Sequence, residues 1–138
     1  MSKLLERLRD AVRSGVYRVT RSDAIDEALR GAKLDAAQVD LEGGDALRAF
    51  AQALHFPDWF GDNWDALEDC LGDLSWRPGD GHVLVLRNWQ ELPPDDLGVL
   101  IDVLRSSAEF WSGRGRPFFA VLVDPEKKLA LQSLHREP

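Results

Sequence analysis

The chain has 138 residues, an apolar content of 44% and a formal net charge of −7. This length suits one domain with a sizeable buried core, and the acidic balance argues against a general nucleic-acid binder, which needs a basic surface. The single cysteine excludes an internal disulfide.

Residues 1–36 predict an N-terminal extension of helix, strand and helix that packs on the main domain. Residues 1–13 place leucines at helical spacing with Lys and Arg between them, and this stretch is too short to favour membrane or nucleic-acid binding. It lacks the apolar core of a signal peptide, and no later segment approaches a membrane span, so we expect a cytoplasmic protein without membrane contact. Residues 15–20 alternate as a strand does, and Ser22 or Asp23 can begin a helix that ends near Arg30.

Residues 37–123 read as alternating strands and helices. We expect strands at 37–41, 82–86 and 118–123, with helices at 45–54, between residue 63 and Gly72, and at about 95–112. The last two strands are almost continuously apolar and are joined by a helix, which indicates parallel strands buried on both faces with a right-handed crossover. The predicted fold class is α/β. For residues 124–138 we expect a tail or a short helix, because Asp124 can cap a helix and Pro125 suits its first position.

Residues 56–76 stand out because they hold six acids and no base. Asp62 or Asn63 can cap a helix that ends at Gly72. The helical period turns four residues toward the core, and we expect the carboxylates between them to point outward. The inward set is Trp64, Leu67, Cys70 and Leu71; the six acids are Asp58, Asp62, Asp65, Glu68, Asp69 and Asp73. Phe56, Trp59 and Phe60 precede the helix, so aromatic anchors flank an acidic surface that suits a cationic partner.

Other interpretations of this segment are weaker. A charged stripe opposite an apolar one is often only a solvated helix face. Asp65 and Asp69 could form a catalytic carboxylate pair, but neighbours on one exposed helix lack the burial that separates two pKa values. A calcium loop fails on the position of its glycine, and three scattered histidines with one cysteine do not make a zinc site. We therefore expect no enzyme activity, no metal and no cofactor.

The unbroken pattern from Pro57 to Leu71 resembles the barstar family, the intracellular inhibitors of the secreted ribonuclease barnase. The shared features are an aromatic pair after the proline and its acid, a Gly-acid-Asn turn, and the Asp-Ala-Leu and Asp-Cys-Leu runs of the following helix. The resemblance extends more loosely over residues 37–123. It implies a barstar-like fold with a small parallel sheet packed by helices, to which residues 1–36 add a strand and a helix.

The resemblance also implies a partner-binding site. Asp69 corresponds to the aspartate that takes the place of a substrate phosphate, and Asp65 to a second acid one turn earlier. Trp59 corresponds to an aromatic residue that stacks on the enzyme. Glu68 stands where the family has a tryptophan, and Ser106 where it has an interface glutamate, for which Glu109 could substitute on the same helix face. The complete predicted set is Trp59, Gly61, Asn63, Trp64, Asp65, Glu68, Asp69, Ser106 and Glu109.

The function that follows is inhibition of a basic ribonuclease, of the barnase type or a related toxin nuclease, inside the producing cell. The predicted partner is a protein, with no direct contact to nucleic acid, and we expect a monomer. The alternative is a barstar-like adaptor module that binds a basic protein other than a nuclease.

Overall fold

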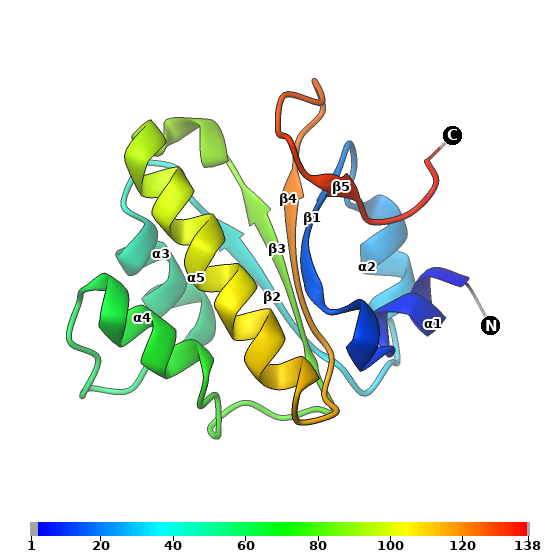
Figure 1. Ribbon diagram of the computed structural model, residues 1–138, viewed down its shortest axis with the longest axis horizontal. Coiled ribbons are helices and arrows are strands. Elements are labelled where there is room, and N and C mark those ends of the chain that lie inside the picture. Colours follow the sequence, from blue (N-terminus) through cyan, green and yellow to red (C-terminus); the bar gives the residue numbers. More distant parts are fainter. Residues whose placement is uncertain (1–2, 138) are drawn as a thin grey trace.

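The computed structural model describes residues 3–137 and places five parallel strands in one sheet, in the order β2-β3-β4-β1-β5 (Figure 1). The strands are β1 (Gly15–Val19), β2 (Asp35–Asp40), β3 (His82–Arg87), β4 (Phe118–Val123) and β5 (Gln132–Ser133). The α-helices are α1 (Lys3–Leu8), α2 (Asp23–Leu29), α3 (Ala46–Leu54), α4 (Trp64–Leu71) and α5 (Pro94–Ser112). Short 3-10 turns lie at Ala11–Arg13 and Trp89–Glu91.

Helices cover the sheet on both faces (Figure 1). On one face α3, α4 and α5 pack over the larger apolar cluster, which contains Phe50, Leu67 and Leu104. On the other face α1 and α2 pack over a smaller cluster, which contains Leu8 and Ile25. Because both faces are covered, the central strands β3 and β4 are buried along almost their whole length. The predicted α/β class and the parallel pairing of these two strands are confirmed.

The N-terminal helix ends before the predicted 1–13 segment does, and residues 1 and 2 of that segment lie outside the described residues. It ends at Leu8, and the Asp10 carboxylate accepts a hydrogen bond from the Val12 backbone N–H at 3.1 Å, which starts a separate 3-10 turn. Val12, an apolar residue in helical register with Leu5 and Leu8, is 85% exposed. The cap-forming aspartate therefore interrupts the helix before the apolar pattern is complete.

After β4 the chain forms a tail with a two-residue strand, and residues 124–137 contain no helix, so of the two expected forms the tail is the one observed. The Asp124 carboxylate does cap a turn, accepting from the backbone N–H groups of Lys128 (3.0 Å) and Leu129 (2.8 Å). Lys127, however, has a φ of 55°, which a right-handed helix does not allow. The tail then follows β1, where Leu134 is fully buried and donates its backbone N–H to Arg18 O at 3.0 Å.

No helix within residues 3–137 has the length and apolar character that crossing a lipid bilayer requires.

A glycine inside α5 offers a stability test. Gly98 lies on the exposed side of the helix, and a Cβ built there meets no atom within 4 Å. We expect Gly98→Ala to raise the free energy of unfolding by about 0.5–1 kcal/mol, because alanine loses less backbone entropy in a helix. Urea denaturation monitored by tryptophan fluorescence measures this change.

Gly79→Ala is the contrasting variant. Gly79 has a φ of +106°, and a Cβ there would lie 2.7 Å from the backbone nitrogen of Asp35. This variant is expected to lower the free energy of unfolding. If Gly98→Ala also destabilises the protein, the helix does not follow the geometry described above.

Candidate functional site

The acidic segment is built as a tight turn followed by α4. The Phe60 N–H donates to Pro57 O at 3.0 Å, and Asp62 takes a left-handed conformation with a φ of 55°, which Asp tolerates better than most residues. Asn63 is the N-cap, since its Oδ1 accepts a hydrogen bond from Ala66 N at 2.7 Å. Of the two predicted caps, Asn63 is therefore the one that is used, and Gly72 is the C-cap as expected.

The inner and outer faces of α4 agree with the sequence pattern. Leu67, Cys70 and Leu71 are fully buried, and Trp64 is partly buried against the same cluster. All six acids of residues 56–76 are exposed. Within residues 3–137 none of them takes part in an ion pair. We call this surface the acidic face; its residues are Asp58, Asp62, Asp65, Glu68, Asp69 and Asp73.

A hollow of about 410 Å³ lies between α4 and α5 beside the acidic face. Glu68 and Asp69 line it from α4, and Ser106 and Phe110 line it from α5. The structure thus brings three of the predicted site residues together. The hollow also contains the aromatic ring of Phe110, which is 41% exposed. The guanidinium of Arg114 lies over this ring, 4.4 Å from its centroid.

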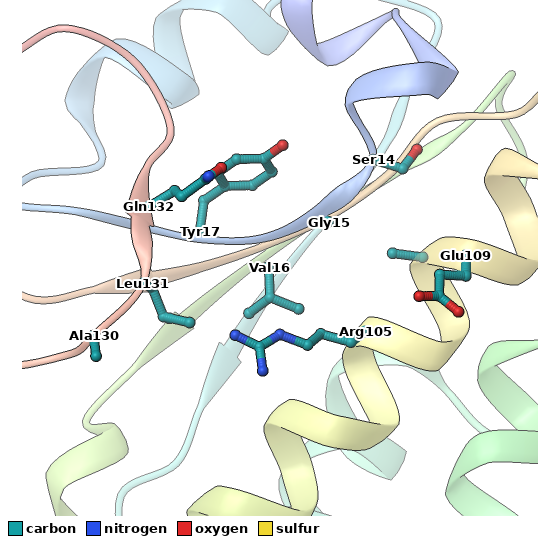
Figure 2. A pocket seen from close by; sticks show the side chains of 10 residues that line it. Ser14, Gly15, Val16, Tyr17, Arg105, Glu109, Ala130, Leu131 and Gln132 are labelled. Atoms are coloured by element: carbon teal, nitrogen blue, oxygen red, sulfur yellow. The ribbon is translucent and has the colours of Figure 1, made fainter.

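Glu109 does not join this group. It lines a different hollow, of about 350 Å³, together with Arg105 and residues of β1 and the C-terminal tail. Figure 2 shows Arg105 and Glu109 on the flank of α5 that faces Val16 and Leu131. Glu109 lies about 60° around the helix axis from Ser106 and lines the hollow on the side away from α4, so its substitution for the family's glutamate stays a prediction.

Four aromatic side chains form an aromatic lip beside the acidic face. Phe56 and Phe60 meet edge to face with ring centroids 4.9 Å apart, and Trp76 contacts both Phe56 (6.1 Å) and Trp59 (6.2 Å). The Trp76 indole is fixed by a hydrogen bond to Leu54 O at 2.8 Å. Trp59 lies outermost and is 58% exposed. Trp59 is therefore available to a partner. Trp76 packs against it, and Phe56 and Phe60 extend the same cluster behind Trp76.

A buried ionic network holds the segment that follows Trp76. Arg77 donates two hydrogen bonds to the Asp35 carboxylate, at 2.8 and 3.0 Å, and His82 Nδ1 donates to the same carboxylate at 3.0 Å. Asp35 and His82 are buried at the start of β2 and β3. The network thus ties the chain that carries Trp76 to the sheet, and it supports the aromatic lip from a distance.

Three residues near this site were not predicted: Phe110, Asp35 and Arg77. Phe110 could have been found, because an apolar residue lies outside the buried stripe of α5 that contains Leu104 and Trp111. Asp35 carried a weaker signal, since it shares the buried side of β2 with Ala37 and Val39. Its partner Arg77 is 42 residues away in the chain, and no local pattern links the two.

Cys70 has no features of a reactive thiol. It is fully buried on the inner side of α4, and burial raises the pKa of its thiol to about 11, with Asp73 and Asp69 adding to this increase. The thiol is therefore protonated near neutral pH and serves as a small apolar core residue, as the sequence pattern indicated.

A protein-family model described as Barstar (barnase inhibitor) matches residues 32–123. The match includes 92 of the 138 residues and spans β2, α3, α4, β3, α5 and β4, while α1, β1, α2 and the tail lie outside it. It confirms the resemblance seen in residues 57–71. A comparison with curated proteins finds no match.

The buried histidine predicts how stability depends on pH. Burial lowers the pKa of His82 below its ordinary value of 6.5, although Asp35 acts in the opposite direction. In the unfolded chain His82 takes up a proton as the pH falls through about 6.5, whereas the folded protein resists this protonation. The free energy of unfolding should therefore fall between pH 7.5 and 5.5, as measured by urea denaturation.

His82→Gln is the control for this pH dependence, because glutamine can still donate to Asp35 but does not titrate. The variant should lose less stability than the natural chain over the same pH interval. Contributions from all other titrating groups are common to both proteins and cancel in the comparison. An equal loss in both proteins would exclude His82 as the source.

Proposed function

The chain belongs to the barstar family, and we propose that it inhibits a ribonuclease of the barnase type, or a related toxin nuclease, inside the cell that produces it. Proteins of this family bind ribonucleases and act as inhibitors rather than enzymes.

The observation that carries this proposal is the combination of exposed, unpaired carboxylates on α4 with an exposed tryptophan beside them. Asp65, Glu68 and Asp69 project from one side of the helix. Like charges so close together cost a few tenths of a kcal/mol, roughly 0.2–0.5, in an isolated helix. An arrangement that costs stability without any internal base to offset it is well suited to a cationic partner, which would remove the repulsion on binding.

The proposed mechanism is electrostatic mimicry of RNA. A ribonuclease holds phosphates with Lys, Arg and His side chains, and carboxylates can occupy those positions without offering a bond to cleave. Asp69 is assigned to the phosphate position because it corresponds to the family's phosphate-mimicking aspartate, and its place in the lining of the hollow between α4 and α5 is compatible with this role. Asp65 lies one turn earlier on the same helix, and Trp59 is assigned to stack on the enzyme from the aromatic lip. Gly61, Asn63 and Trp64 shape the turn that joins these elements.

The α5 wall of the hollow gives this chain its own specificity. Ser106 stands where the family has an interface glutamate, and Phe110 lies one turn beyond it with an exposed ring. Opposite Ser106 and Phe110, a matching partner would present an apolar or stacking side chain and not a basic one. Its basic side chains would lie opposite Glu68 and Asp69 on the other wall. An inhibitor with acids on both walls would suit a cleft that is basic throughout. The target of this chain is therefore proposed to be a ribonuclease whose active-site cleft is basic on one side and apolar on the other.

Asp69→Asn tests the assignment with little change in shape. We expect the purified chain to abolish the activity of its cognate ribonuclease at a ratio near one to one, and the variant to bind more weakly by about 2 kcal/mol or more. This is the usual threshold for an interface hot spot, for which the barnase–barstar pair is itself a standard example. Titration of ribonuclease activity with inhibitor measures both quantities.

Glu42→Gln is the matched control, because it also removes one exposed carboxylate but lies outside the acidic face. It should inhibit as the natural chain does. If Asp69→Asn also inhibits normally, Asp69 is not in the interface. If the natural chain inhibits no basic nuclease yet captures a basic protein, the adaptor function replaces the one proposed.

Association should also slow steeply with ionic strength. The acidic face carries six carboxylates and would steer a basic partner over long range, but salt shortens that range to about 10 Å at 0.1 M. Stopped-flow association rates at several salt concentrations provide the measurement. A rate that does not change with salt would mean that the acidic face is only a solvated helix surface.

A further inference from the structure

A second charged surface lies far from the acidic face and has the opposite sign. A hollow of about 480 Å³ is lined by five basic side chains that come from α1, β1 and the C-terminal tail. They are Arg7, Arg18, Lys127, His135 and Arg136, and we call this site the basic hollow. All five lie outside the residues that match the barstar family, so inhibition of a ribonuclease does not account for them.

The fold brings these bases together through buried leucines. Strand β5 pairs with β1 so that Arg18 lies opposite Ser133, and the backbone N–H of Leu134 donates to Arg18 O at 3.0 Å. Leu134 and Leu8 are both fully buried in the cluster under α1 and α2. Their chain neighbours His135 and Arg7 are therefore held at the rim of the same hollow.

The positive charges of the hollow outnumber its negative ones. Among residues 3–137 none of the five bases takes part in an ion pair. Arg18 is held by a hydrogen bond from its Nε to Leu131 O at 2.9 Å, which leaves the outer nitrogens of its guanidinium available. One carboxylate, Glu137, also lines the hollow and accepts hydrogen bonds from the backbone N–H (2.9 Å) and the hydroxyl of Thr20; its charge offsets that of one base, and the four Lys and Arg side chains leave the hollow positive.

The distribution of charge along the chain supports a separate role for this region. Residues 32–123 hold sixteen acids against seven Lys and Arg, a net charge of −9, whereas the remaining residues hold eight acids against ten bases, a net charge of +2. The overall value of −7 therefore conceals a basic region. A protein that only steered a basic partner would gain nothing from a cluster of bases.

One residue that lines the hollow, His135, has a ring nitrogen without a hydrogen-bond partner among the described residues. His135 Nε2 is a buried polar side-chain atom with no hydrogen-bond partner in the part of the chain described. Buried polar groups without partners are rare because they lose their hydration without compensation. The ring would have to turn before this nitrogen could meet a ligand oxygen in the basic hollow, so His135 is a secondary part of the site and the arginines are its main part.

We propose that the basic hollow binds a small ligand with two or more phosphate groups, such as pyrophosphate or the phosphate tail of a nucleotide. Its volume lies within the roughly 300–1,000 Å³ of small-molecule sites. One arginine guanidinium group can bind two phosphate oxygens at once. Three arginines line this hollow. A single phosphate would leave most of these donors unused, so the charge and size of the hollow fit a polyphosphate better.

Isothermal titration of the full chain with pyrophosphate tests this site. The expected result is saturable binding of one pyrophosphate per chain, weakened at least about tenfold in the double variant Arg7→Gln/Arg136→Gln. Both side chains lie at the hollow without holding the tail to β1, and a urea denaturation curve checks that the variant is folded. Arg48→Gln is the matched control, since it removes an exposed arginine on α3 and should bind pyrophosphate as the natural chain does.

Three results would overturn the proposal. The first is the absence of saturable pyrophosphate binding at millimolar concentrations. The second is an equal loss of binding in Arg48→Gln and the double variant, which would indicate general attraction of anions. The third is binding of a short oligouridylate but not of pyrophosphate, which would make the surface a track for RNA. Ribonuclease inhibition should be unchanged in the double variant, so this test is independent of the acidic face.

Discussion

The hydrogen bond from the indole of Trp111 to the carbonyl oxygen of Leu71, at 2.7 Å, fixes the end of α4 against α5, and the candidate site depends on this junction. The last carbonyls of a helix have no partner within the helix, so a buried donor at this position stabilises the helix end. Asp69 and Phe110 lie one or two residues before the joined pair. The junction therefore sets the separation between the acidic and aromatic walls of the hollow.

A tryptophan indole also donates a hydrogen bond to the last carbonyl of two other elements, α3 and β4. Trp76 donates to the carbonyl of Leu54, the last residue of α3, and Trp89 donates at 2.9 Å to that of Val123, the last residue of β4. Each indole buries a large apolar area and satisfies one backbone acceptor that would otherwise lack a partner. The indole N–H groups of these tryptophans are hydrogen-bonded within the protein, whereas Trp59 is mostly exposed. The use of the indole N–H thus separates structural tryptophans from one suited to an interface.

The sequence predicted features that depend on local periodicity and failed where distant contacts decide. The direction of the carboxylates on α4 followed from the spacing of Leu67 and Leu71, because the buried stripe determines the exposed one. The tail shows the opposite case: its capping signal at Asp124 is real, but burial of Leu134 beside β1 draws the chain along the sheet. Helical spacing alone also does not say which neighbour each flank of α5 meets, so the sequence did not predict the hollow that Glu109 lines.

The two charged surfaces of the protein have different structural supports, and this separation has a consequence for how they work. The acidic face belongs to the layer of α3, α4 and α5, while the basic hollow lies where α1 and the C-terminal tail meet the β1–β5 edge of the sheet (Figure 1). Charges on opposite sides of a domain lie farther apart than the screening length of about 8 Å at physiological salt. A protein partner on α4 and a polyphosphate at the basic hollow would therefore neither compete for residues nor cancel each other's field at close range.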